Sequence, residues 1–179
     1  ADRHVSFFIR DFDAGHVARF LRRMEKETPL CKIVGPHGTF VLRETPKPKL
    51  FVAGGTGLTP FLSMLHRMRS INDWSAKTTL VYGSSKSGSV YGFDEIEAAK
   101  ALIPAFDAII CTDDGVLDGA QQGSPISFIS ESLASLEEGG DPAEVYMCGP
   151  PGLVAAAEAV AAGDGGSARR IFSESFAHT

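Results

Sequence analysis

The clearest chemical signal in the sequence is a glycine-rich turn that directly follows the apolar run at residues 51–53. Its glycines can adopt positive φ and allow a phosphate to approach the backbone, which a Cβ atom would block. The free N–H groups at the start of the following helix would add a positive field for an anion, and two threonines would add hydroxyl donors. The residues concerned are Gly54, Gly55, Thr56, Gly57, Thr59 and Pro60. They predict a phosphate-binding turn, although their spacing is not G-x-G-x-x-G, and the alternative is a structural turn that binds nothing.

Two further segments carry side chains that could contact a ligand. Cys148, Gly149, Pro150 and Pro151 follow the apolar run Val145 to Met147, and the segment IFSESF near the end of the chain contains Glu174 and Phe176. In an open parallel sheet, the turns at the carboxyl ends of the strands form the binding crevice, so the glycine turn and the Cys148 turn would face one ligand. The alternatives are a small buried cysteine at a strand end and an ordinary edge strand near the end of the chain.

The turns after two other predicted strands could contact the ribose or the ring of a dinucleotide. Gly83, Ser84 and Ser85 follow one strand, at the position where an acid usually selects a free ribose hydroxyl. Because this loop has no acid, it would tolerate a 2′-phosphate on the ribose. Asp113 and Asp114 follow the next strand and could hydrogen-bond the ring side of such a ligand or simply form a polar turn.

Strands that alternate with helices must position these segments. We expect strands at residues 50–53, 78–82, 108–112, 144–148 and 170–172, and helices at residues 60–70, 94–102, 125–136 and 151–162. This alternation predicts a five-stranded parallel sheet covered on both faces. Antiparallel strands are expected at residues 4–10, 30–34 and 39–42, with a helix at residues 17–24 and a proline-rich linker at residues 45–50.

Composition excludes several classes of function. The formal net charge of −5 disfavours nucleic acid and anionic lipid as partners, because both require clustered cations. No apolar run approaches the ~20 residues of a membrane helix. The histidines show no ligand spacing and Cys31, Cys111 and Cys148 are widely separated, so we expect no metal site. The absence of an export signal in the sequence favours the cytoplasm.

Taken together, the three segments resemble the ferredoxin–NADP reductase superfamily, which carries a G-G-T-G-x-x-P turn, a later C-G-P-P turn and a terminus with an acid and an aromatic residue. The sequence is most similar to the reductase components of bacterial ring-hydroxylating dioxygenases and multicomponent monooxygenases, judged by GPHGTFVLRE at residues 35–44 and QGSPI at residues 122–126. The resemblance implies a partial FAD-binding β-barrel domain at residues 1–46 and an NAD(P)-binding α/β domain at residues 47–179.

The resemblance also implies residue roles and an electron-transfer activity. NADH, or alternatively NADPH, would reduce FAD, and electrons would pass to a ferredoxin, a [2Fe-2S] domain or an oxygenase component. Gly55, Thr56 and Gly57 would hold the pyrophosphate, while Cys148 and Gly149 would flank the nicotinamide. Glu174 would polarise the site, and Phe176 would cover the flavin until nicotinamide displaces it. The turn for the FAD pyrophosphate is matched by Gly15, His16, Val17 and Ala18.

The sequence departs from the family pattern in three places. It lacks the Arg-x-Tyr-Ser motif that grips the flavin, Ala18 replaces the usual Ser or Thr, and no C-x4-C-x2-C run is present for a plant-type cluster. The iron–sulfur cluster would therefore lie on other sequence. Two alternatives stay open: a related subunit of flavohaemoglobin or dihydroorotate dehydrogenase type, and a non-catalytic nucleotide-binding or docking domain.

Overall fold

The computed structural model describes residues 6–10, 15–24, 32–35, 37–71, 74–163 and 169–176. The chain divides into two units, residues 1–39 and residues 40–179. Within the first unit, helix α1 spans His16–Met24, which confirms the helix predicted at residues 17–24.

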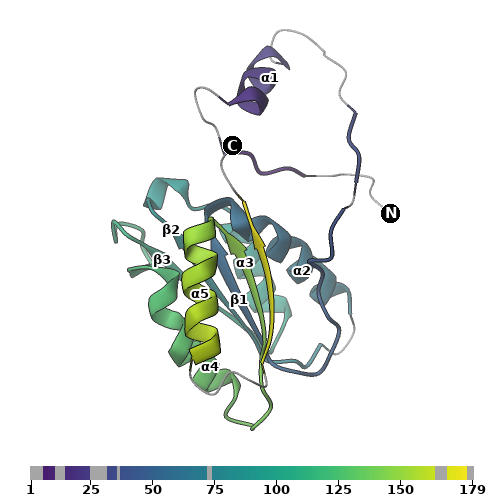
Figure 1. The fold of residues 1–179 in the computed structure, drawn as a ribbon, viewed down its shortest axis with the longest axis vertical. Helices are drawn as coiled ribbons and strands as arrows, with labels where there is room; N and C mark the ends of the chain where they lie inside the picture. The colour runs from purple at the N-terminus through teal and green to yellow at the C-terminus, as the bar shows by residue number, and fades with distance from the viewer. Residues whose placement is uncertain are drawn as a thin grey trace. The chain divides into compact units, whose positions relative to one another are not determined.

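The second unit is a parallel six-stranded sheet in the order β4-β3-β2-β1-β5-β6 (Figure 1). Its strands are β1 (Lys49–Gly54), β2 (Thr78–Ser84), β3 (Phe106–Thr112), β4 (Gln121–Gln122), β5 (Glu144–Gly149) and β6 (Arg170–Ser175). The five predicted strands are all present. The predicted count is one too low, because β4 has only two residues, both exposed glutamines, and carries no apolar alternation that a sequence could reveal.

Four helices cover the two faces of this sheet (Figure 1). They are α2 (Thr59–Ser70), α3 (Phe93–Leu102), α4 (Ile129–Leu136) and α5 (Pro151–Gly163). Short 3₁₀ turns η1 (Gly55–Leu58) and η3 (Pro125–Phe128) lead into α2 and α4, and η2 (Ser87–Ser89) precedes α3. The helix predicted at residues 125–136 is thus a 3₁₀ turn followed by an α-helix. Ser124 caps it, because its hydroxyl accepts a hydrogen bond from the Ile126 N–H at 3.4 Å.

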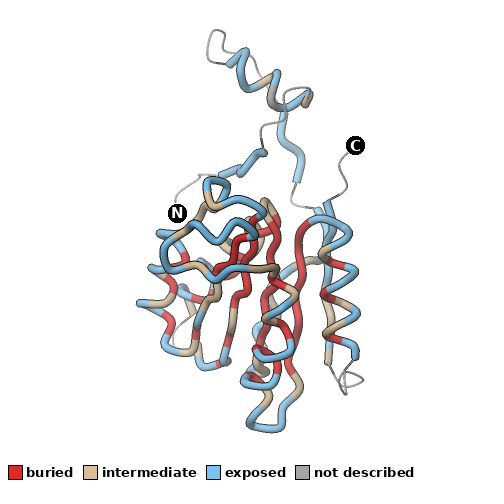
Figure 2. The backbone as a smooth tube through the Cα atoms, turned by 90° about the vertical axis from the view of Figure 1, so that its left-hand side faces the viewer, coloured by how far each residue is buried: buried red, intermediate tan, exposed pale blue. Residues whose placement is uncertain are grey.

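Alternate residues of the central strands feed two separate apolar cores, as the period of two in a strand requires. Phe51 and Ala53 of β1 pack with α2 and α3, whereas Leu50 and Val52 pack with α4 and α5. Every residue of β1 and of β5 is buried, and Figure 2 shows these strands in red at the centre of the sheet. Two fully buried adjacent strands give the turns at their ends a rigid support.

The antiparallel strands predicted near the start of the chain are not found in the described residues. Residues 6–10, 32–34 and 39–42 form no ladder, while the remaining residues of those predictions lie outside the described part. A strand persists only when its N–H and C=O groups pair with a neighbouring strand, and the described residues of the first unit supply none. The barrel and the boundary at residues 46 and 47 stay predictions.

Residues 40–48 belong to the second unit and pack against its sheet and α2. The Phe40 ring meets those of Phe61 and Tyr146 edge-on at centroid distances of 5.9 and 6.0 Å. The Tyr146 hydroxyl accepts a hydrogen bond from the Arg43 N–H at 3.1 Å. These contacts explain why the second unit begins at residue 40.

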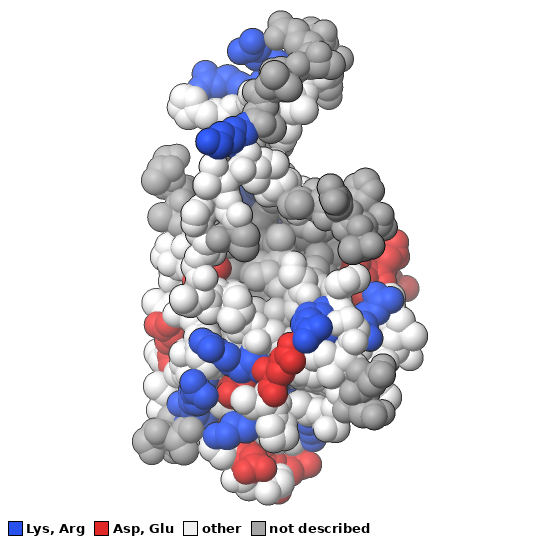
Figure 3. All heavy atoms as spheres, turned by 90° about the vertical axis from the view of Figure 1, so that its right-hand side faces the viewer, with Lys and Arg blue, Asp and Glu red and all other residues white. Residues whose placement is uncertain are grey.

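The surface of the second unit has no large single-sign field on the face that Figure 3 views. Basic and acidic side chains are interspersed over its lower part. The described residues contain no helix that is long and apolar enough to cross a membrane.

Candidate functional site at the carboxyl edge of the sheet

The three segments singled out in the sequence meet at the carboxyl edge of the sheet. β1 pairs with β5 so that Ala53 lies opposite Cys148, and β5 pairs with β6 so that Cys148 lies opposite Glu174. The Phe176 N–H then donates to the Gly149 carbonyl at 3.0 Å. The glycine turn, the cysteine turn and the acid-plus-aromatic segment therefore lie side by side.

The glycine turn and the cysteine turn touch backbone to backbone. A Cβ placed on Gly57 would lie 2.1 Å from the Cys148 carbonyl oxygen and 2.7 Å from the Gly149 nitrogen. A Cβ on Gly149 would lie 3.1 Å from the Gly54 carbonyl oxygen. Gly55 has φ +53°, and a Cβ there would meet nothing within 4 Å, so this residue faces open space. Glycine is therefore required at 57 for close approach and is favoured at 55 by the left-handed backbone.

Tyr91 belongs to this site although sequence reasoning did not identify it. Its hydroxyl lies 3.1 Å from the Thr56 carbonyl oxygen and 3.1 Å from Thr59 Oγ1. Thr59 Oγ1 in turn donates to the Thr56 carbonyl at 2.9 Å. A tyrosine in the loop before α3 offers no local pattern, because its partners lie more than 30 residues earlier in the chain.

The ends of β2 and β3 bring the other predicted residues together at one end of this edge. Asp113 donates its N–H to the Ser84 carbonyl at 3.4 Å, and Ser84 Oγ donates to the Lys86 carbonyl. The Asp114 carboxylate accepts hydrogen bonds from the Ser87 N–H at 2.9 Å and the Ser87 hydroxyl at 3.1 Å. These bonds hold the pKa of Asp114 below its ordinary value, although its side chain is exposed.

The strand order separates these aspartates from Cys148. β3 lies beyond β2, whereas β5 carries Cys148 on the other side of β1. Asp113 and Asp114 therefore stand beside the loop at Ser84 and Ser85, not beside the cysteine turn. Gly83 is held close to η3, since a Cβ there would lie 2.2 Å from Pro125 Cγ.

Comparison with known proteins identifies the domain. A family model described as the oxidoreductase NAD-binding domain matches residues 51–159. The chain belongs to this family. The matched region contains the glycine turn, the Ser84 loop, both aspartates and the cysteine turn.

Two curated relatives of this NAD-binding domain are electron transfer components. The 2-halobenzoate 1,2-dioxygenase electron transfer component of Burkholderia cepacia is 33% identical over 178 residues, which are 98% of this chain and 51% of that protein. The toluate 1,2-dioxygenase electron transfer component of Pseudomonas putida is 31% identical over 176 residues, again 98% and 51%. The chain spans about half the length of these relatives.

A solved structure shows the same fold. The ferredoxin–NADP⁺ reductase of Plasmodium falciparum superposes with a TM-score of 0.67, covering 93% of this chain and 69% of that one at 18% identity. The α/β fold class predicted from sequence is thereby confirmed.

Cys148 is a neutral thiol in this NAD-binding domain. It is fully buried, and burial, with a smaller contribution from the Glu174 charge, raises the pKa of its thiol to about 12. Glu174 is exposed at the edge strand. Burial likewise raises the pKa of the Cys111 thiol to about 12, and neither cysteine forms a disulfide. Cys148 is therefore uncharged at neutral pH and cannot act as a thiolate.

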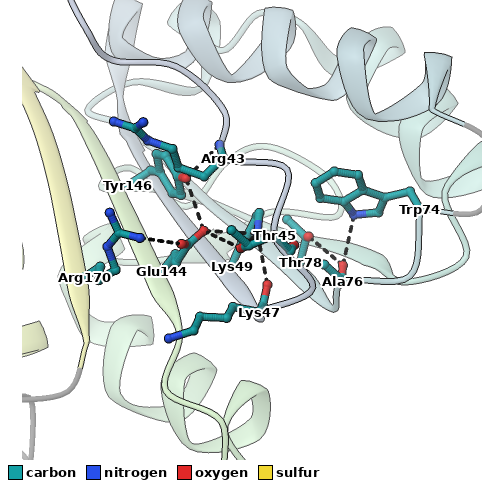
Figure 4. A network of polar contacts seen from close by, with 10 residues as sticks. All are labelled: Arg43, Thr45, Lys47, Lys49, Trp74, Ala76, Thr78, Glu144, Tyr146 and Arg170. Atoms are coloured by element: carbon teal, nitrogen blue, oxygen red, sulfur yellow. Dashed lines mark hydrogen bonds and ion pairs between the residues drawn. The ribbon is translucent and has the colours of Figure 1, made fainter.

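The opposite, amino edge of the NAD-binding domain holds a buried ion pair (Figure 4). Lys49 Nζ lies 3.2 Å from Glu144 Oε2, and both side chains are fully buried. Lys49 also donates to the carbonyls of Thr45 and Lys47, and Glu144 also accepts from the Thr45 hydroxyl. Burial lowers the pKa of Lys49, and the charge of Glu144 opposes this change. The network fixes residues 45–49 against the first residue of β5, far along the strands from the site.

The residues predicted for a flavin pyrophosphate lie in the first unit. Gly15 is half-buried, His16 and Val17 are exposed, and α1 begins at His16. The Gly15 carbonyl accepts the Arg19 N–H at 3.0 Å, which is the first turn of that helix. Their role toward FAD stays a prediction. Among the described residues no three His, Cys, Asp or Glu side chains gather as a metal site.

Proposed function

We propose that this chain is the NAD(P)H-binding part of a flavin-dependent reductase that delivers electrons to an iron–sulfur protein or an oxygenase component. The observation that carries the proposal is the convergence of the glycine turn, the cysteine turn and the Glu174–Phe176 segment on one edge of the sheet. The two relatives, which are named as dioxygenase electron transfer components, support the same assignment.

The turns fit a pyridine dinucleotide in shape and charge. The missing Cβ at Gly55 leaves the backbone open to a ligand, and the missing Cβ at Gly57 lets the turn pack closely against Cys148. A pyrophosphate can therefore approach the first N–H groups of η1, which leads into α2. No carboxylate lies within residues 54–60 to repel it. The cysteine turn, adjacent through Gly57, would then receive the nicotinamide.

The chain's own residues perform positioning and exclusion of water. The bound cofactors supply the redox chemistry, in which NADH gives two electrons as a hydride and FAD accepts them and releases them singly. The buried, uncharged Cys148 would support the turn that receives the nicotinamide without adding charge. Phe176 is 39% exposed, so its ring is available to cover a flat group at the same edge. Glu174, opposite Cys148, would orient the polar end of the nicotinamide.

We propose NADH rather than NADPH as the preferred coenzyme. Asp113 and Asp114 add two carboxylates next to the Ser84–Ser85 loop, which by itself has no acid. Negative charge at this end of the edge disfavours a 2′-phosphate and suits a free ribose hydroxyl. The exposed Lys86 in the same loop is the feature that keeps NADPH open.

The direct test is anaerobic reduction of the purified full-length protein. It should be yellow, and NADH should bleach its flavin absorbance faster than NADPH does at equal concentration. Colourless full-length protein would favour the non-catalytic docking domain and refute the reductase. The rate of electron transfer from the reduced flavin should then be compared for a [2Fe-2S] ferredoxin, a haem acceptor and an orotate acceptor. Faster transfer to the ferredoxin would favour the proposed partner over those of the related flavohaemoglobin and dihydroorotate dehydrogenase subunits. The cytoplasmic location stays a prediction.

A further inference from the structure

A three-oxygen cluster lies directly behind the glycine turn. The Thr56 carbonyl oxygen, Thr59 Oγ1 and the Tyr91 hydroxyl lie 2.9 to 3.1 Å from one another. The two hydroxyls have one proton each, so at any moment two of the three contacts carry a hydrogen bond. The Thr59 N–H also donates to the Thr56 carbonyl as the turn closes. One carbonyl of the coenzyme turn is therefore held by up to three donors.

Tyr91 is held firmly enough to act as an anchor. Its ring packs edge-on against Tyr82 at a centroid distance of 6.1 Å, and Tyr82 is fully buried. The next residue, Gly92, has φ +70°, and a Cβ there would lie 2.9 Å from Leu58 in the turn itself. Burial raises the pKa of Tyr91, so its hydroxyl keeps its proton at neutral pH and can donate.

The direction of one carbonyl fixes the direction of the whole turn. Peptide units in a helical turn are aligned, with their carbonyls toward the carboxyl end and their N–H groups toward the amino end. A Thr56 carbonyl held from the protein side therefore aims the N–H group of the same peptide unit, which belongs to Gly57, in the opposite direction. Gly55, which precedes this carbonyl, has φ +53°, and nothing lies within 4 Å of its Cβ position, so the hydrogen bonds to the Thr56 carbonyl are needed to hold this part of the turn.

We propose that Tyr91 is a positioning residue that orients the glycine turn for the coenzyme's pyrophosphate. This inference rests on the proposed function, since it assigns the turn to NADH. Tyr91 acts through hydrogen bonds to the Thr56 carbonyl and Thr59 Oγ1. Its loss should therefore weaken coenzyme binding and leave the rate of hydride transfer from bound coenzyme nearly unchanged.

The test is stopped-flow reduction of the flavin-loaded full-length protein by NADH, comparing Tyr91→Phe with Tyr82→Phe. The first variant removes the hydroxyl from the cluster and keeps the ring. The second removes the hydroxyl of the neighbouring ring, which forms no hydrogen bond to the Thr56 carbonyl. We expect the NADH Kd of Tyr91→Phe to rise about five- to tenfold, the size of one or two lost hydrogen bonds, with a limiting rate within about twofold of wild type. Tyr82→Phe should keep both values within about twofold.

Each other outcome overturns the inference. An unchanged Kd in Tyr91→Phe, an equal rise in Tyr82→Phe, or a fall in the limiting rate alone would show that Tyr91 does not orient the turn. Wild-type protein that NADH leaves oxidised would refute the proposed function as well, so the two failures are distinguishable. If Tyr91→Phe does not fold, Thr59→Val removes the other hydroxyl that donates to the Thr56 carbonyl and should raise the NADH Kd in the same way. Thr59→Ser keeps a hydroxyl at this position and should have the wild-type Kd. A wild-type Kd in Thr59→Val would contradict the proposal.

Discussion

Replacing Gly57 with alanine should disable the coenzyme site without emptying the flavin site. The new Cβ would lie 2.1 Å from the Cys148 carbonyl oxygen and 2.5 Å from its carbonyl carbon, whereas ordinary contact begins near 3.4 Å. Both obstructing atoms are backbone atoms of Cys148 in the buried strand β5, so no flexible side chain can move aside. The glycine turn and the cysteine turn must therefore separate by about 1 Å, the difference between these distances.

A displacement of this size is costly for a reaction that depends on contact. A shift of about 1 Å between bound groups lowers rates by on the order of 100-fold, so we expect kcat/KM for flavin reduction by NADH to fall about 100-fold in Gly57→Ala. Overpacking should also lower the free energy of unfolding by about 1–3 kcal/mol. FAD content should stay at the wild-type level, because the residues predicted to hold it lie in the first unit.

The assay is anaerobic stopped-flow reduction at low NADH concentration, with flavin content measured from absorbance. Gly139→Ala is the matched control, since a Cβ at Gly139 meets nothing within 4 Å and its φ is not positive. It should retain wild-type kinetics. A Gly57→Ala protein that is folded, yellow and reduced at the wild-type rate would refute the assignment of the two turns to one coenzyme site.

Three further predictions follow from the charges of the second unit. Burial raises the pKa values of the Cys111 and Cys148 thiols in the folded state to about 12 from 9.0, so these thiols lose their protons first in the unfolded state. The free energy of unfolding should therefore fall by about 1 kcal/mol per thiol between pH 8 and pH 10, as measured by urea unfolding at the two pH values. Glu144→Gln leaves the fully buried Lys49 without its counter-charge and should lower the free energy of unfolding by about 3 kcal/mol in the same assay. Asp114→Asn should raise the NADPH-to-NADH ratio of kcat/KM about fivefold at low salt, and less at high salt because the effect is a screened charge.

Each of these has a control in the chain. Cys111→Ala should remove about half of the alkaline loss that the two thiols cause, and a loss of the same size as in wild type would argue against buried thiols as its source. Glu138→Gln alters a carboxylate that is 75% exposed and lies 3.9 Å from Lys77, so it should change stability by less than about 1 kcal/mol. An equal effect at 138 and 144 would contradict the importance of burial. An Asp114→Asn protein with an unchanged coenzyme ratio would remove Asp114 from coenzyme selection.

Much of the α/β domain could be predicted because its signals are local. Residues 50–53 are a short apolar run that leads straight into glycines, and the structure extends that strand by only one residue at each end. Cys148 and Glu174 likewise lie at the carboxyl ends of β5 and β6. Since parallel strands end at the same edge, their convergence followed from the strand pattern alone.

The missed features depend on neighbours distant in sequence. The position of Asp113 and Asp114 beside Ser84 follows from the strand order, which the sequence does not state. Tyr91 joins the site through a turn 35 residues earlier. Lys49 falls in the predicted linker at residues 45–50, yet it is fully buried, because Glu144 and nearby carbonyls satisfy its charge. The strands predicted within residues 4–42 are not seen in the described residues for a related reason. A strand requires a partner strand, and the described residues of the first unit do not supply one.

The most direct measurement of the central claim is a titration of the isotope-labelled chain with NAD⁺, followed by amide chemical shifts. The account predicts that the largest shift changes fall on Gly55, Thr56, Gly57 and Gly149, with smaller ones at Ser84 and Ser85. Saturable changes that instead cluster at the amino edge, around Lys49 and Glu144, or a titration that leaves the glycine turn unchanged, would contradict it.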